Sequence, residues 1–231
     1  MSNELRFTFS LDKLINAIAF FASKGIRDLT KLKVAKLLYF ADKDHLLQYG
    51  RPIIGDEYFC LPYGPVPSVS LNEINDALHS SSLEDDESIN ADAICFASTL
   101  KVHRPFFGHP VFRAKQGYDA DVFSKSELNS LNRISERFGS KTASQLVELS
   151  HKELAWMLPN KNRPAGGRAR IPYELFFHDA DAEAQQLLRF IKEEQADNGE
   201  LDAFMCDNNA NWGNQLDAEP SAGRPALQGT L

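Results

Sequence analysis

The sequence predicts a mainly α-helical α+β fold, with helices packed around a small antiparallel β hairpin or sheet. Several segments repeat apolar residues at helical spacing directly after Ser or Thr residues that can cap a helix. Between these segments lie short runs rich in Ile, Tyr and Phe that Gly and Pro interrupt. Of the 231 residues, 43% are hydrophobic and 25% are charged, which is typical of a folded globular protein.

The first two predicted helices each begin at a capping residue. Ser10 caps the first, whose apolar residues share one face as far as Ala22, and Gly25 is its expected end. Thr30 caps the second, which we expect to end at Gly50. The apolar set of this second helix is too broad for a surface stripe, so we expect it to be buried on more than one side.

The segment after the second helix predicts a short hairpin or an irregular β excursion. Residues 51–65, RPIIGDEYFCLPYGP, are rich in Ile, Tyr and Phe. They contain Gly55 and Asp56, a pair at which the chain can easily reverse its direction. Prolines in this region lack an amide donor, so a long ladder cannot form there. These prolines are Pro62, Pro65 and Pro67.

A third helix is expected to begin at Ser68 or Ser70, because the four residues from Ser70 form a capping box. Residues 80–92 are polar and acidic and predict a loop. Residues 93–102 and 110–114 have the composition of strands. We expect these two strands to pair with each other or with the first hairpin.

Sequence patterns in the second half of the chain predict mostly helices. A capping box at Ser124 opens one that we expect to end at Gly139. The remaining expected elements are a short helix over residues 142–149, one or two turns after a capping box at residues 150–153, a basic loop over residues 159–170 and a last helix near residues 180–194.

The expected domain organisation is one folded domain over residues 1–195 and an acidic, disordered tail over residues 196–231. From about Asp197 the hydrophobic period fails, and Asn, Gly, Asp, Ala and Pro dominate. Such a composition buries too little apolar surface to offset the entropy of ordering the chain.

Charge and cysteine usage narrow the class of protein. The formal net charge of −7 argues against duplex binding, because phosphate contacts need clustered Lys and Arg. Three widely spaced cysteines fit a reducing compartment better than a disulfide framework. No targeting leader or membrane-length apolar run is evident, so we expect a soluble, cytoplasmic protein without a membrane partner.

Catalytic and metal-binding patterns are weak. The sequence holds no GxSxG, GxxxxGK[ST] or HExxH motif and no CxxC pair. Asp42 and His45 lie three residues apart on the second helix, so they share a face. An enzyme that uses this pair on a nucleotide or nucleic-acid substrate is one alternative. The favoured interpretation is a non-enzyme with no catalytic residues, cofactor or metal.

Two basic clusters leave a nucleic-acid partner as a minor alternative. In an acidic chain they are better interpreted as solvated edges, and we expect no nucleic-acid partner. The clusters are Lys31, Lys33, Lys36 and Lys43 on the second helix, and Lys161, Arg163, Arg168 and Arg170 in the basic loop.

Aromatic residues and Arg51 gather around the Gly- and Pro-rich segment. Tyr and Arg are the residue types that dominate binding hot spots, but the same aromatics could instead form a domain core. The residues alone leave both interpretations open. The aromatics are Tyr39, Tyr49, Tyr58, Phe59 and Tyr63.

Residues 36–68, KLLYFADKDHLLQYGRPIIGDEYFCLPYGPVPS, resemble the Panacea, or SocA-like, antitoxin domain. Their KLLYFAD helix, YGRPI-GD-Y hairpin and YGPVPS turn are similar to the core of that family. Residues 123–156 resemble its second signature, and a weaker likeness extends the covered region to roughly residues 9–180.

The resemblance implies an antitoxin that neutralises a co-encoded toxin by direct contact, through occlusion or conformational inhibition. The main alternative is a proteolytic adaptor that delivers the toxin to an ATP-dependent protease. The implied partners are the cognate toxin and, further, a protease or a chaperone. The expected partner-binding residues are Lys36, Tyr39, Asp42, His45, Tyr49, Arg51, Asp56, Tyr58, Tyr63, Pro65 and Pro67.

Overall fold

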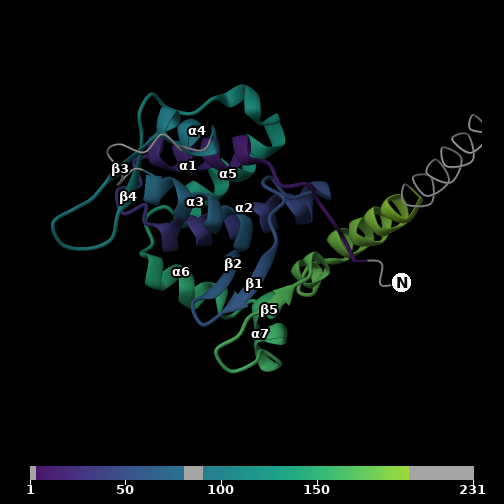
Figure 1. Ribbon diagram of the computed structural model, residues 1–231. Coiled ribbons are helices and arrows are strands. Elements are labelled where there is room, and N and C mark those ends of the chain that lie inside the picture. The colour runs from purple at the N-terminus through teal and green to yellow at the C-terminus, as the bar shows by residue number, and fades with distance from the viewer. Residues whose placement is uncertain (1–3, 81–90, 198–231) are drawn as a thin grey trace, which may run out of the picture. The chain divides into compact units, whose positions relative to one another are not determined.

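The computed structural model describes residues 4–80 and 91–197 and has the expected mainly helical α+β fold (Figure 1). Its helices are α1 (Leu11–Ser23), α2 (Lys31–Tyr49), α3 (Ser68–Ser80), α4 (Ala91–Thr99), α5 (Lys125–Phe138), α6 (Ala143–Ser150) and α7 (Leu154–Lys161), and residues 182–197 are also helical. Its strands are β1 (Tyr58–Leu61), β2 (Gly64–Pro67), β3 (Leu100–His103), β4 (Val111–Ala114) and β5 (Ala169–Ile171). Short 3-10 helices cover η1 (Ala120–Val122) and η2 (Tyr173–Phe177).

The strands form two small antiparallel sheets. One has the order β2-β1-β5, with Tyr58 opposite Pro67 on one side and opposite Ile171 on the other. The other is the β3-β4 hairpin, with Leu100 opposite Ala114. β3 and β4 therefore pair with each other, which was one of the two pairings expected.

Helix α2 lies in the middle of the fold, where it packs against α3, α5, α6 and β2 (Figure 1). Leu37, Leu38 and Ala41 are all completely buried. The broad apolar set of this helix thus correctly predicted burial on more than one side. Side chains on α2 are therefore held in place by core packing on several sides of the helix.

The predicted caps of α1, α2 and α5 are confirmed. Ser10 and Thr30 accept hydrogen bonds from the first turns of α1 and α2, and Gly50 ends α2 with a left-handed φ of 75°. Ser124 forms a complete capping box with Glu127 at the start of α5. These signals are local, which is why the sequence was sufficient to find them.

The predicted strand over residues 93–102 is wrong for most of its length. Residues up to Thr99 belong to α4, and only residues 100–103 form a strand. The helix is favoured because it packs against α1 and α3, where its Phe96 is buried. A short apolar run does not by itself separate a buried helix from a strand.

The hairpin is present, but its reversal is not at Gly55 and Asp56. β1 and β2 are joined through Pro62 and Tyr63, and Gly64 supplies the positive φ of 93°. Gly55 also has a positive φ, of 75°, in the loop before β1. Both glycines are therefore needed for backbone conformation, but only the second belongs to the hairpin turn.

Two other expected boundaries change in the C-terminal half. α7 continues through Pro159, and the predicted basic loop contains β5, which pairs with β1. The expected capping box at residues 150–153 is absent, because Ser150 is the last residue of α6 and Glu153 precedes α7 without a side-chain cap.

The chain divides into a compact unit that ends at Ile191 and a second unit from Lys192 onward. Of the loop expected over residues 80–92, residue 80 belongs to α3, residues 91 and 92 belong to α4, and residues 81–90 lie outside the described residues. Of the disordered tail expected over residues 196–231, residues 196 and 197 are helical, and the rest lies outside the described residues. Within residues 4–80 and 91–197, no helix combines the length and the apolar character that a membrane crossing requires.

A pair of glycine substitutions tests how tightly the loop before β1 is fixed. Gly55 and Gly25 have nearly equal φ values of 75° and 79°, but a Cβ at Gly55 would overlap the Thr8 carbonyl, whereas a Cβ at Gly25 has open space. We expect Gly25→Ala to lower the free energy of unfolding by about 1 kcal/mol through left-handed strain alone. Gly55→Ala should cost about 3 kcal/mol or more, because the chain must move as well. Urea denaturation of both variants measures the difference, and equal losses would show that the Thr8 contact is unimportant.

Candidate partner-binding site

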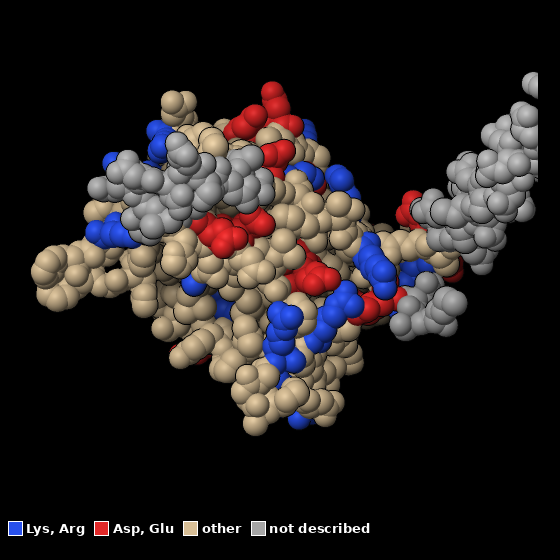
Figure 2. Space-filling model, in the orientation of Figure 1, with Lys and Arg blue, Asp and Glu red and all other residues tan. Residues whose placement is uncertain are grey.

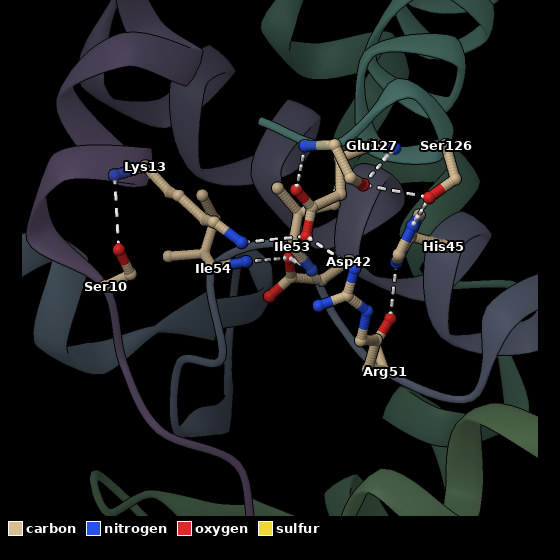
Figure 3. A network of polar contacts seen from close by, with 10 residues as sticks. Ser10, Lys13, Asp42, His45, Arg51, Ile53, Ile54, Ser126 and Glu127 are labelled. Carbon is tan, nitrogen blue, oxygen red and sulfur yellow. Dashed lines mark hydrogen bonds and ion pairs between the residues drawn. The ribbon is translucent and has the colours of Figure 1, made fainter. Parts of the chain in front are cut away.

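Asp42 fixes the path of the chain after α2. Its Oδ1 accepts hydrogen bonds from the backbone N–H groups of Ile53 (2.9 Å) and Ile54 (2.8 Å), and its Oδ2 accepts one from the Tyr58 hydroxyl (3.0 Å). Figure 3 shows the carboxylate facing the backbone of Ile53 and Ile54. The side chain is completely buried, and this burial raises the pKa of Asp42 to about 7.

Asp56 also binds backbone N–H groups through its carboxylate, at the start of α3. Its two carboxylate oxygens accept from the backbone N–H groups of Val69 (2.9 Å) and Ser70 (2.7 Å), so it caps α3 from outside the helix. A negative charge there also complements the positive end of the helix. The expected capping box from Ser70 is therefore wrong: α3 begins at Ser68 and a distant carboxylate caps it.

Lys36 is a lysine in the interior. Its ammonium group donates to the Pro65 carbonyl at 2.7 Å, and burial lowers the pKa of Lys36 to about 7. A Cβ at Gly64 would lie 2.7 Å from Nζ and would overlap Ser150 Oγ. The hairpin can approach α2 and α6 this closely only because residue 64 is glycine.

His45 connects the end of α2 to the following loop and to α5. Burial lowers its pKa, so the ring is neutral near pH 7. The Arg51 carbonyl lies 2.7 Å from Nδ1 and can only accept, so Nδ1 carries the proton and Nε2 accepts from the Ser126 hydroxyl at 3.0 Å. Figure 3 shows the imidazole between these two partners.

The Glu127 carboxylate, near His45, lies close to two cationic side chains. It pairs with Lys13 at 2.8 Å and lies 3.7 Å from an Arg51 nitrogen, while its other oxygen accepts from the Ser124 backbone. Burial opposes ionisation of Glu127, but these donors together hold its pKa below the usual value. α1, the loop after α2 and α5 thus meet at one carboxylate.

Tyr39 and Tyr58 belong to an aromatic core. The Tyr39 ring lies 5.6 Å from Tyr58 and 5.3 Å from Phe176, in edge-to-face arrangements. Both tyrosines are almost completely buried, and burial raises the pKa of the Tyr39 hydroxyl. Their rings support the fold from the inside.

Exposure divides the eleven residues expected to bind a partner. Eight are buried in the described fold: Lys36, Tyr39, Asp42, His45, Asp56, Tyr58, Pro65 and Pro67. Three remain at the surface, namely Tyr63 at 68% exposure, Tyr49 at 46% and the Arg51 side chain at 54%. In this conformation only these three can touch a partner through their side chains.

Asp42 and His45 do not act on each other. Their hydrogen bonds run to different groups, and both side chains are completely buried. Within the part of the chain that the structure describes, no three His, Cys, Asp or Glu side chains converge as metal ligands.

Tyr49 lines an acidic groove. The groove has a volume of about 780 Å³ and lies between the end of α2 and residues 179–187. Its apolar lining includes Leu47 and Leu187, and its acidic lining consists of Asp44, Asp179, Asp181 and Glu183. A basic, partly apolar segment would complement such a surface.

Most residues of the two basic clusters found in the sequence are engaged within the fold. Lys33 is buried and donates to Asp28 and to the Gly139 carbonyl, and Lys43 pairs with Glu153. Further contacts join Lys31 to Asn75, Arg163 to Asn160, Arg168 to the Phe59 ring and Arg170 to Glu4. On the face that Figure 2 shows, Lys and Arg are interspersed with Asp and Glu.

Sequence reasoning missed Phe106 and Phe107, in the loop between β3 and β4. They are 94% and 84% exposed, although both are large and apolar. The signal was two adjacent phenylalanines between Pro105 and Gly108, where a turn normally carries polar residues.

Substitution of Asp42 separates its charge from its geometry. Asp42→Ala leaves two backbone donors and the Tyr58 hydroxyl unpaired in the interior, so we expect a loss of about 4 kcal/mol in the free energy of unfolding. Asp42→Asn keeps an oxygen for the two backbone donors, and we expect a loss of about 1 to 2 kcal/mol. Chemical denaturation compares the two, and equal losses would mean that these hydrogen bonds do not fix the loop.

Lys36 predicts a particular pH dependence of stability. Its pKa is about 7 in the folded protein, against an ordinary lysine value of 10.5 in an unfolded chain, so between these pH values the unfolded chain binds more protons. The free energy of unfolding should therefore rise with pH above 7, by up to about 1.4 kcal/mol per unit from this group. We expect Lys36→Met to lose this contribution between pH 7.5 and 9, whereas exposed Lys31→Met keeps the wild-type slope. Denaturation curves across that range test it, and parallel slopes for all three proteins would contradict it.

Comparison with protein-family models assigns the core of this structure. The family model described as antitoxin SocA-like, Panacea domain, matches residues 34–157. The match includes most of α2, the β1-β2 hairpin and α5, so it covers both signature segments that the sequence suggested. Comparisons with curated proteins and with solved structures found no match. With more than half of its residues matched, the chain belongs to the Panacea family of antitoxin SocA-like domains.

Proposed function

We propose that the chain is the antitoxin of a toxin-antitoxin system and neutralises a co-encoded toxin by direct binding. Membership of the antitoxin SocA-like, Panacea family carries the proposal. The family also favours a role other than catalysis. In line with it, Asp42, His45, Lys36 and Asp56 hydrogen-bond to the backbone and stabilise loops of their own domain.

The proposed contact surface consists of the candidate residues whose side chains are exposed. Tyr63 lies at the tip of the β1-β2 hairpin, and Tyr49 and Arg51 flank the end of α2. Tyr and Arg are enriched in binding hot spots, because each combines a large contact area with a polar group. The hydrogen bonds that Asp42 accepts and the one that Lys36 donates hold this segment in one conformation, which reduces the entropy lost on binding.

The charge of the chain favours a basic partner surface. The protein has 32 acidic and 25 basic residues, and the groove beside Tyr49 is lined by four carboxylates. Complementary charge raises the rate of association and excludes acidic competitors. A toxin whose active site or regulatory surface is basic would be occluded by such contact.

Co-expression with the adjacent open reading frame tests this function. The neighbour alone should arrest growth, and the wild-type chain should restore growth and co-purify with it. If the toxin level stays constant during rescue, neutralisation proceeds by occlusion or conformational inhibition. A toxin level that falls would instead support the adaptor mechanism, and a harmless neighbour would refute the proposal.

Substitution of the hairpin tip tests the contact surface. We expect Tyr63→Ala to weaken toxin binding at least tenfold, because it removes an exposed aromatic ring. Ile94→Ala removes a 57% exposed apolar side chain on α4 and serves as the matched control, with binding unchanged. Titration calorimetry measures both. Unchanged affinity for Tyr63→Ala would remove the hairpin tip from the interface.

A further inference from the structure

The loop between β3 and β4 presents an aromatic pair that the fold does not use. Phe106 and Phe107, which we call the aromatic tip, are the most exposed large apolar side chains of the described residues. Figure 1 shows this loop extending away from the neighbouring helices at the left of the view. A phenylalanine buries about 150–250 Å² when it is enclosed, so the tip holds a large amount of unused contact area.

The two rings are organised with respect to each other. Their centroids are 4.7 Å apart, and the planes meet at 85°, an edge-to-face pair. Gly108 follows with a φ of 108°, and Pro105 and Pro110 restrict the backbone on either side. The loop thus presents both rings together as one unit.

The base of the loop is fixed to the core. Arg104 donates to the Leu78 carbonyl of α3 at 2.8 Å, and Phe112 donates its backbone N–H to the Leu29 carbonyl at 3.0 Å. Phe112 itself is buried. A projecting anchor on a fixed base loses little freedom on binding, because its position is set beforehand.

The segment that carries the aromatic tip is basic in an acidic protein. Residues 93–118 contain no Asp or Glu but four cations and two histidines: Lys101, Arg104, Arg113, Lys115, His103 and His109. Lys101 and Lys115 are exposed, whereas Arg104 donates to the Leu78 carbonyl. In Figure 2 the end of this loop is the tan projection at the left, beyond the nearest blue side chains. A complementary site would be apolar at its centre and acidic at its rim.

We propose that the aromatic tip is a second contact site of this antitoxin and inserts into an apolar pocket with an acidic rim on the toxin. The inference rests on the proposed function. It differs from the hairpin contact in location and in charge, because Tyr63 belongs to the other sheet and the groove beside Tyr49 is acidic. The toxin would then be held at two surfaces of opposite charge.

Other occupants are less well supported by the same residues. Attachment to an anionic bilayer needs an apolar anchor and a polybasic patch, but Arg104 is directed toward α3 by its bond to Leu78. A second copy of the chain could offer the acidic groove beside Tyr49. Such a head-to-tail contact continues from molecule to molecule unless a ring closes.

The test measures the affinity of the purified chain for the product of the adjacent open reading frame. In the double variant Phe106→Ser/Phe107→Ser, we expect affinity to fall roughly 30-fold or more, as for a hot spot. Phe190→Ser, at a 62% exposed position outside the family match, is the control and should bind as wild type does. In Lys101→Glu/Lys115→Glu, we expect a several-fold loss that is largest at low salt. All variants should keep the wild-type melting temperature, because these side chains are exposed.

Each outcome has a separate meaning. If the wild type neutralises the toxin and the tip variant binds it equally well, this inference is overturned while the proposed function stands. If the wild type neither binds nor neutralises its neighbour, both fail. Flotation with phosphatidylserine vesicles and size-exclusion chromatography accompany the titration. A tip-dependent vesicle contact or oligomer, with toxin affinity unchanged, would assign the tip to lipid or to a second copy and overturn the toxin as its occupant.

Discussion

The structure depends on one buried carboxylate, that of Asp42. It accepts from two consecutive backbone amides and a tyrosine hydroxyl, so a single helical side chain sets the direction of the loop that leaves α2. Burying an acid is unfavourable unless its oxygens are hydrogen-bonded. Here the three donors belong to the loop after α2 and to β1. The hydrogen bonds that make burial of the Asp42 carboxylate tolerable therefore also fix the position of that loop.

The same logic extends along the segment. Pro65 and Pro67 cannot donate to a ladder, so β2 depends on side chains for part of its stability. Lys36 donates to the Pro65 carbonyl, and the Asp56 carboxylate caps the helix that follows Pro67. The polar residues of the signature therefore replace backbone hydrogen bonds that a proline-rich chain cannot make.

This explains which features the sequence could predict. Caps such as Ser10, Thr30 and Ser124 act within four residues, and all three were found. β5 was missed because its strand conformation depends on pairing with β1, more than 100 residues earlier. Likewise, an exposed helix edge was the natural interpretation for Lys33, because its partner at Gly139 is distant in sequence. Among the candidate contact residues, sequence pattern identified the segment but not which side chains face outward.

The separation of buried polar groups from exposed aromatics has a consequence for specificity. Replacing Asp42 or Lys36 disturbs the core, whereas Tyr63 and Phe107 occupy hairpin tips whose bases are held by other residues. Substitutions at those tips leave core packing and the buried hydrogen bonds intact, so their cost in stability is small. A domain built in this way can change the partner it fits without changing its fold. The contact chemistry at the tips can therefore vary while the polar residues that hold the segment stay the same.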